Sequence, residues 1–315
     1  MTAGFKRGLR DVGEGVFAYL QPDGGWGWSN AGLLVDGEST LLIDTLFDLR
    51  LTAQMLSEMR RAVPAAARID TLVNTHANGD HTYGNQLVGD ARIVASRRTA
   101  EEMPELPAST MAALLENAPG LGEVGEFFMR IFGAFDFSGI DATLPTDTFE
   151  GELTLRVGAS ELRLLEVGPA HTRGDTLVLA PAQRVLFTGD ILFHGMHPLA
   201  WAGPISNWVS ACERILDMDV DVIVPGHGPL ADKHAIGELR DYFEYLGEEA
   251  RLCHAAGMAP LDAARKIALD RWAQWQEPER LVLNIITIYR ELDNDQEPLN
   301  VLEAFRDMAE LAGEG

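Results

Sequence analysis

Three side chains that can bind a metal ion, His76, Asp80 and His81, lie close together in one short segment of the chain. The segment follows an apolar, β-branched run at 70–74 that is typical of a buried strand, and it leads into a short helix expected to open near Thr82. Imidazole nitrogen and carboxylate oxygen are common ligands of zinc and iron. A polar turn with hydrogen-bonded histidines is the alternative for such a cluster when it stands alone.

Three distant segments repeat the same arrangement. The runs 161–167, 184–187 and 221–224 are apolar and β-branched, and each is followed by Gly or Pro and then by one further ligand-type residue. These residues are His171, Asp190 and His227. Side chains at the ends of neighbouring strands converge, so the sequence predicts a metal site built from four parts of the chain.

This ligand series resembles that of the metallo-β-lactamase superfamily of hydrolases, and the resemblance spans roughly residues 16–229. It implies two metal positions, one built from His76, His171 and the residue at 78, the other from Asp80, His81 and His227, with Asp190 bridging them. The first motif of the family usually reads His-x-His-x-Asp-His, and here Asn78 replaces its second histidine. Because an amide oxygen is a weaker ligand than imidazole, we expect the Asp80/His81/His227 position to hold its ion more firmly.

The resemblance also implies a chemistry. Zinc, as one or two ions, is the expected cofactor, with iron and manganese as alternatives, and a metal lowers the pKa of water from 15.7 towards about 7. We therefore expect a hydrolase that cleaves an ester, thioester, lactone or amide by metal-activated hydroxide, with Asp80 and Asp190 as catalytic carboxylates. The alternatives are a mononuclear iron dioxygenase that uses His76, His171 and Asp190, a natural-product cyclase or thioesterase, and a binding protein with a degraded metal site.

Aromatic residues suggest a pocket for an apolar part of the substrate. The region 97–139 is read as a helical insert with helices at 109–117 and 123–137, and Phe128 and Phe132 lie on its apolar stripe. Such a stripe is either core or, in the alternative, part of a lid or pocket wall near the metal. Trp26 and Trp28 lie in a glycine-rich turn and are assigned the same two readings.

Two histidines follow Asp190 in a loop that contains glycine and proline. His194 is a candidate proton donor to the leaving group, and His197 a candidate pocket residue. A solvated loop is the alternative for both.

The remaining pattern predicts an α/β fold. Two β-rich halves, each followed by helices, indicate a four-layer αβ/βα sandwich, with a catalytic domain at 1–257 and a helical extension at 258–315 that caps the sandwich or forms a dimer surface. The main strands and helices are expected at 16–20, 30–35, 41–44, 92–95, 49–63, 207–216, 234–252, 261–269, 279–292 and 301–311.

Composition limits the partners and the compartment. A formal net charge of −23 argues against nucleic acid, and no apolar run is long enough to cross a membrane. The two cysteines, Cys212 and Cys253, are read as reduced thiols. No signal peptide is visible, so we expect a cytoplasmic protein that acts on a small molecule and forms a homodimer in one reading of its tail.

Overall fold

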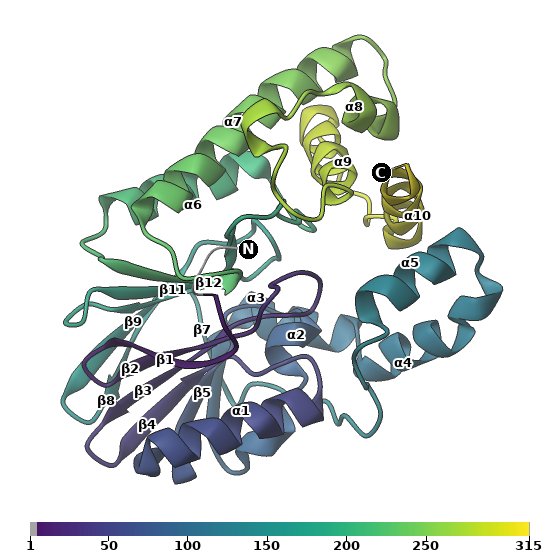
Figure 1. The fold of residues 1–315 in the computed structure, drawn as a ribbon. Helices are drawn as coiled ribbons and strands as arrows, with labels where there is room; N and C mark the ends of the chain where they lie inside the picture. Colours follow the sequence, from purple (N-terminus) through teal and green to yellow (C-terminus); the bar gives the residue numbers. More distant parts are fainter. Residues whose placement is uncertain (1–4, 315) are drawn as a thin grey trace.

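The computed structural model describes residues 5–314 and contains two β-sheets packed face to face (Figure 1). The first sheet has antiparallel pairing through its fourth strand and parallel pairing beyond it. Its strands, in spatial order, are β1 (Gly8–Gly13), β2 (Val16–Leu20), β3 (Ala31–Asp36), β4 (Ser39–Ile43), β5 (Thr71–Val73), β6 (Arg92–Ser96) and β7 (Asp147–Phe149).

The second sheet is antiparallel, except that the two strands that come last in the sequence pair in parallel. Its spatial order is β12 (Val222–His227), β11 (Val185–Phe193), β10 (Thr176–Ala180), β9 (Ser160–Glu166) and β8 (Glu152–Val157). The inner faces of both sheets share one apolar cluster, in which Leu34 and Leu41 lie with Leu164, Val178 and Phe187. Burial of these side chains holds the two sheets together.

Helices cover the outer faces and form one side of the molecule (Figure 1). Their bounds are α1 (Leu49–Ala62), α2 (Gly79–Thr82), α3 (Arg97–Glu102), α4 (Ala108–Asn117), α5 (Glu123–Phe132), α6 (Ile205–Asp217), α7 (Lys233–Ala255), α8 (Pro260–Lys266), α9 (Arg280–Asp293) and α10 (Val301–Gly313). Helix α1 shows the logic of the outer layers: Asp48 caps its first turn by accepting from the amide of Leu51, and Met55 and Met59 are buried on one face. The predicted αβ/βα sandwich is confirmed.

Three local expectations need correction. The helix expected near Thr82 begins at Gly79, so Asp80 and His81 lie in its first turn. The helix expected over 123–137 ends at Phe132, and Gly133 caps it. The strand expected to end at Phe187 continues to Phe193, because Gly189 takes a φ of +50° and lets the strand change register instead of turning away. Strand β1 was not expected at all.

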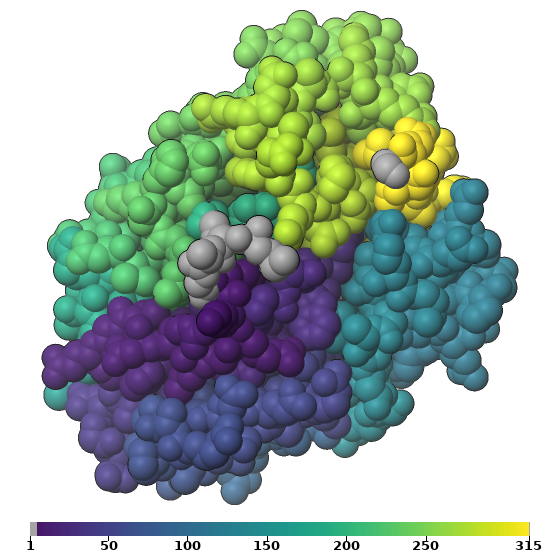
Figure 2. Space-filling model, viewed as in Figure 1, coloured from purple at the N-terminus to yellow at the C-terminus, as the bar shows by residue number. Residues whose placement is uncertain are grey.

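The tail closes one side of the molecule. Helices α8 and α9 contact α7. Helix α10 contacts α5, so the helical tail lies beside the helical insert (Figure 2). The predicted division between residues 257 and 258 falls between α7 and α8 and remains a prediction. Within residues 5–314, no helix is both long enough and apolar enough to cross a bilayer.

Candidate metal centre

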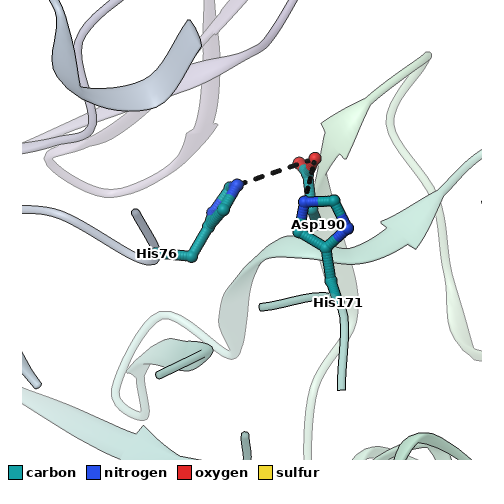
Figure 3. Close-up of side chains that lie close together, drawn as sticks. All are labelled: His76, His171 and Asp190. Atoms are coloured by element: carbon teal, nitrogen blue, oxygen red, sulfur yellow. Dashed lines mark ion pairs between the residues drawn. The ribbon is translucent and has the colours of Figure 1, made fainter. Parts of the chain in front are cut away.

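Six side chains of ligand type meet at one edge of the two sheets, in two groups of three. His76, His171 and Asp190 form one group, shown in Figure 3. Asp80, His81 and His227 form the other, and within each group the candidate ligand atoms lie within 4.8 Å of one another. All six residues are buried.

Different elements position these residues. His76 lies just beyond β5, while Asp80 and His81 lie in α2. His171 lies in the connection between β9 and β10, Asp190 lies inside β11, and His227 ends β12. The site therefore depends on the correct packing of both sheets.

Asp190 lies between the two groups. Its Oδ2 is 3.7 Å from Nε2 of His76 and 3.3 Å from Nε2 of His171. The same oxygen is 3.4 Å from Nε2 of His227, and Oδ1 is 3.1 Å from Nε2 of His81. Asp80 completes the second group, with Oδ2 3.1 Å from Nε2 of His227. This geometry suits a carboxylate shared by two cation positions.

Every one of the four histidines is oriented through its Nδ1 atom. Nδ1 of His171 donates to the carbonyl of Leu199 at 2.6 Å, and Nδ1 of His227 donates to the carbonyl of Gly24 at 3.0 Å. Because these acceptors fix one hydrogen on Nδ1, the lone pair of Nε2 in each neutral ring is directed at the cluster.

Asp44 orients the other two histidines. Its Oδ2 accepts from Nδ1 of His81 at 2.9 Å and from the hydroxyl of Thr75 at 2.7 Å. Since that hydroxyl donates to Asp44, it accepts from Nδ1 of His76, which lies 3.0 Å away. Asp44 follows β4 in the left-handed region, with a φ of +60°, and sequence reasoning missed it. Like several of the candidate ligands, Asp44 lies at the end of a strand, and this position could have identified it as part of the site.

Unpaired polar atoms test whether a cation fits here. Nε2 of His76, Nε2 of His81 and Oδ1 of Asp190 are buried and have no hydrogen-bond partner among residues 5–314. Buried polar atoms are normally paired, and these face one another at ion-pair distances instead. Close backbone packing limits the space around them, because a Cβ on Gly226 would lie 1.9 Å from Oδ1 of Asp190. The donor set of imidazoles and carboxylates fits a divalent cation such as zinc.

Electrostatics divide the histidines into two pairs. Burial, and then the charge of His81, lower the pKa of His76 well below its usual value, and burial also lowers the pKa of His171. In the second pair burial also opposes the charged form, but Asp190 and Asp80 outweigh it, so the pKa of His227 rises to about 9 and that of His81 rises well above its usual value. The pKa of Asp190 is held well below its usual value by the surrounding histidines, although burial acts to raise it. Asp190 is therefore a carboxylate, as cation binding requires.

Asn78 lies next to the first group. Its Nδ2 atom is 3.0 Å from Nε2 of His171. That ring nitrogen carries no hydrogen, because the hydrogen of His171 is on Nδ1, so the amide donates to the lone pair aimed at the cluster. Asn78 thus competes with an ion for His171.

A cavity of about 1270 Å³ opens onto this cluster. Asp80, His171, Asp190 and His227 lie on its wall. Most of the remaining lining is apolar, with Trp26, Phe128, Phe132, Phe193, Trp201 and Phe305 among the aromatic residues. Phe305 of α10 lies 4.7 Å from Phe128 of α5, between ring centroids, so the tail and the insert build one wall together.

The other predicted pocket residues lie elsewhere. Trp28 packs on Phe135, with ring centroids 4.8 Å apart, and is not on the cavity wall. His194 is also absent from the wall, and its Nδ1 donates to the carbonyl of Pro229 at 3.0 Å. His197 is buried against Tyr242, whose hydroxyl lies 3.1 Å from Nδ1 of His197. The structure does not bring these three residues to the cavity.

Comparison with known proteins identifies relatives of several activities. The model of the metallo-beta-lactamase superfamily matches residues 24–227. The alpha subunit of 2,4-dinitroanisole O-demethylase from Nocardioides sp. is 25% identical over 62% of this chain and 51% of its own length. The human acyl-coenzyme A thioesterase MBLAC2 is 25% identical over 76% of this chain and 86% of its own.

A solved structure extends the likeness to the tail. The sec-alkylsulfatase Pisa1 from Pseudomonas sp. superposes with a TM-score of 0.72 at 18% identity, over 94% of this chain and 53% of that one. The chain thus spans about half the length of the demethylase subunit and of the alkylsulfatase. The family match covers more than half of the sequence and includes the ligand series, and the chain therefore belongs to the metallo-beta-lactamase superfamily.

Proposed function

We propose that this protein is a metal-dependent hydrolase that cleaves an ester or thioester bond in a small molecule with a long apolar portion. The observation that carries the proposal is the place of Asp190, between two groups of candidate ligands and on the wall of a cavity of about 1270 Å³. The names of two relatives agree with it, since an acyl-coenzyme A thioesterase and an alkylsulfatase both act on molecules with a hydrocarbon part.

Two sets of residues would hold the cation, which we propose to be zinc. His76, His171 and Asp190 form the first set, and Asp80, His81 and His227 the second. A bound divalent ion supplies Lewis acidity and makes water ionise near neutral pH. Both predicted catalytic carboxylates, Asp80 and Asp190, belong to these sets, where they would hold the ion and orient the water that it activates.

The cavity wall binds and positions the substrate. Phe128 and Phe132 of α5 and Trp26 of the first loop are buried, and they line the cavity. An alkyl or aromatic group that enters this space loses contact with water, and each buried CH₂ group contributes about 0.8 kcal/mol to binding. This wall would therefore select substrates by the length of their apolar group.

A series of p-nitrophenyl esters, from acetate to laurate, tests both parts of the proposal. The zinc-loaded protein should hydrolyse them, chelation or Asp190→Asn should abolish turnover, and kcat/KM should rise with acyl length. Phe128→Ala should flatten the length dependence. Phe127→Ala is the matched control, because Phe127 is buried on the same helix but is not on the cavity wall, and it should keep the length dependence. No turnover of any ester or thioester would leave a binding protein as the better reading.

The first ligand group also favours a second candidate function. His76, His171 and Asp190 are two histidines and one carboxylate, the set that non-haem iron oxygenases use, and Asn78 does not add a third histidine. Anaerobic loading with ferrous iron, followed by oxygen-uptake measurement, separates oxygenation from hydrolysis.

Compartment and assembly complete the proposal. Cys212 and Cys253 are both buried and unpaired, which supports the reducing environment of the cytoplasm. A homodimer through the helical tail stays a prediction, and light scattering of the purified chain tests it.

A further inference from the structure

A buried arginine lies on the cavity wall beside the candidate metal centre. Arg280 begins α9, is 1% exposed, and lines the cavity together with Asp80, Asp190 and His227. It lies outside the matched family region, in the helical tail.

Aromatic rings hold the guanidinium in place. Its carbon lies 4.5 Å from the ring centroid of Trp26 and 5.4 Å from that of Phe193. Phe193 in turn stacks on the ring of His227, with centroids 5.1 Å apart and planes at 8°. One aromatic ring therefore separates Arg280 from a candidate metal ligand.

The hydrogen-bonding capacity of Arg280 is only partly used. Nη1 donates to the carbonyl of His197 at 3.1 Å, while Nε is buried without a partner in the described part of the chain. Among residues 5–314, no carboxylate lies within direct ion-pair distance of it. Burial lowers the pKa of Arg280, the charges of Glu277 and Glu279 act against that shift, and Glu279 accepts from the indole of Trp26 at 2.9 Å.

The two other arginines of the cavity wall differ in this respect. Arg173 pairs with Glu102, and Arg290 pairs with Asp295 at 2.8 Å. A buried N–H donor without an acceptor, such as Nε of Arg280, destabilises a fold, and an oxyanion that accepts from it removes that penalty. Arginine also suits the task, because its planar fork matches the oxygens of a carboxylate or sulfate.

We propose that Arg280 binds an oxyanion of the substrate, so that the preferred substrate is an amphiphile with an apolar chain and a negatively charged carboxylate or sulfate group close to the bond that is cleaved. This inference rests on the proposed function only in calling the bound amphiphile a substrate, and the binding that it predicts does not require turnover. Arg280 acts here as a specificity residue contributed by the tail.

Binding of non-hydrolysable amphiphiles tests the proposal. Decane-1-sulfonate, decanoate and 1-decanol share one chain length, and calorimetry gives the affinity of each for the zinc-loaded protein. The wild-type protein should bind both anions about tenfold more tightly than the alcohol, as one charge-assisted hydrogen-bonded pair provides. Arg280→Gln should bind all three within about twofold of one another. Arg290→Gln is the matched control and should keep the wild-type preference, because Arg290 already has Asp295 as its partner.

Further arms separate Arg280 from the metal and from folding. The preference for the anions should persist in wild-type protein stripped of metal and should be lost in metal-free Arg280→Gln, which separates Arg280 from His227 and from the other arginines of the wall. Arg280→Lys keeps the charge but loses the fork, and it should weaken decanoate binding while leaving decanol binding unchanged; it decides the matter if Arg280→Gln does not fold. Equal affinity of the wild-type protein for anions and alcohol overturns the proposal, as does an unchanged preference in Arg280→Gln. Loss of ester turnover alone would count against the hydrolase and leave this result intact.

Discussion

Oδ2 of Asp44 lies 2.9 Å from Nδ1 of His81 and joins the end of β4 to the first turn of α2. Through Thr75, the same carboxylate also orients His76, so one residue sets the direction of a candidate ligand in each group.

Asp44→Asn should lower zinc affinity by about 10- to 100-fold, the usual effect of removing a residue that orients metal-binding histidines. Competition with a chromophoric chelator measures this affinity. Asp36→Asn is the control, because Asp36 pairs with Ser39 at the opposite end of β4 from Asp44 and accepts from Ala159 and Ser160 there, and it should bind zinc as the wild-type protein does. Equal zinc affinity in the Asp44 and Asp36 variants would remove Asp44 from the account.

Gly226→Ala should abolish tight zinc binding, because the new Cβ would lie 1.9 Å from Oδ1 of Asp190 and 2.7 Å from the backbone of Gly189. Gly247→Ala is the matched change, since nothing lies within 4 Å of its Cβ in helix α7. That variant should keep zinc and gain about 0.5–1 kcal/mol of stability from helix propensity. Zinc titrations and urea unfolding of both variants check the pair, and normal zinc binding by Gly226→Ala would show that the packing around Asp190 is looser than described.

Asn78→His should raise the occupancy of the His76/His171/Asp190 position, because it exchanges an amide that donates to His171 for an imidazole that can bind an ion. The wild-type protein should hold the ion at Asp80, His81 and His227 firmly and the other only partially. Metal analysis after dialysis measures both. Two firmly held ions in the wild-type protein, or a single ion on the His76 side, would contradict this order.

His197→Gln should make stability less sensitive to acid. Burial, and then the charge of Arg280, lower the pKa of His197 to about 3 in the folded protein. In the unfolded chain the imidazole takes up a proton near pH 6.5, so the stabilisation from neutral His197 is present above that pH and is lost as the pH falls towards 3. Between pH 7 and pH 5 the variant should lose about 2 kcal/mol less unfolding free energy than the wild-type protein. Urea unfolding at both pH values provides the comparison, and parallel losses would mean that His197 is not buried as a neutral ring.

The sequence predicted that the candidate ligands follow apolar strand-like runs, and the structure brings all six side chains together. His76 and His227 lie at strand ends as expected. Asp190 was found for a partly wrong reason: β11 does not end before it, and the left-handed Gly189 keeps Asp190 inside a strand that continues.

Contacts between distant segments were beyond the sequence. Arg280 and Phe305 belong to helices whose periodicity reveals their buried faces but not what those faces contact, and both line the cavity. Trp26 and Trp28 have similar local surroundings in the sequence, yet only Trp26 reaches the cavity, because the turn directs the two side chains to different neighbours. Local pattern shows that a side chain is apolar, and only the packed fold decides which space it fills.

The most direct test of the account is the zinc content of the protein, measured by equilibrium dialysis on wild-type protein and on Asp190→Asn, with ester hydrolysis followed in the same samples. We predict that the wild-type chain retains at least one zinc ion and hydrolyses the ester, and that Asp190→Asn loses both properties while it stays folded. A wild-type chain that retains no zinc, or an Asp190→Asn chain that binds zinc and turns over substrate like the wild type, would contradict a metal centre organised around Asp190.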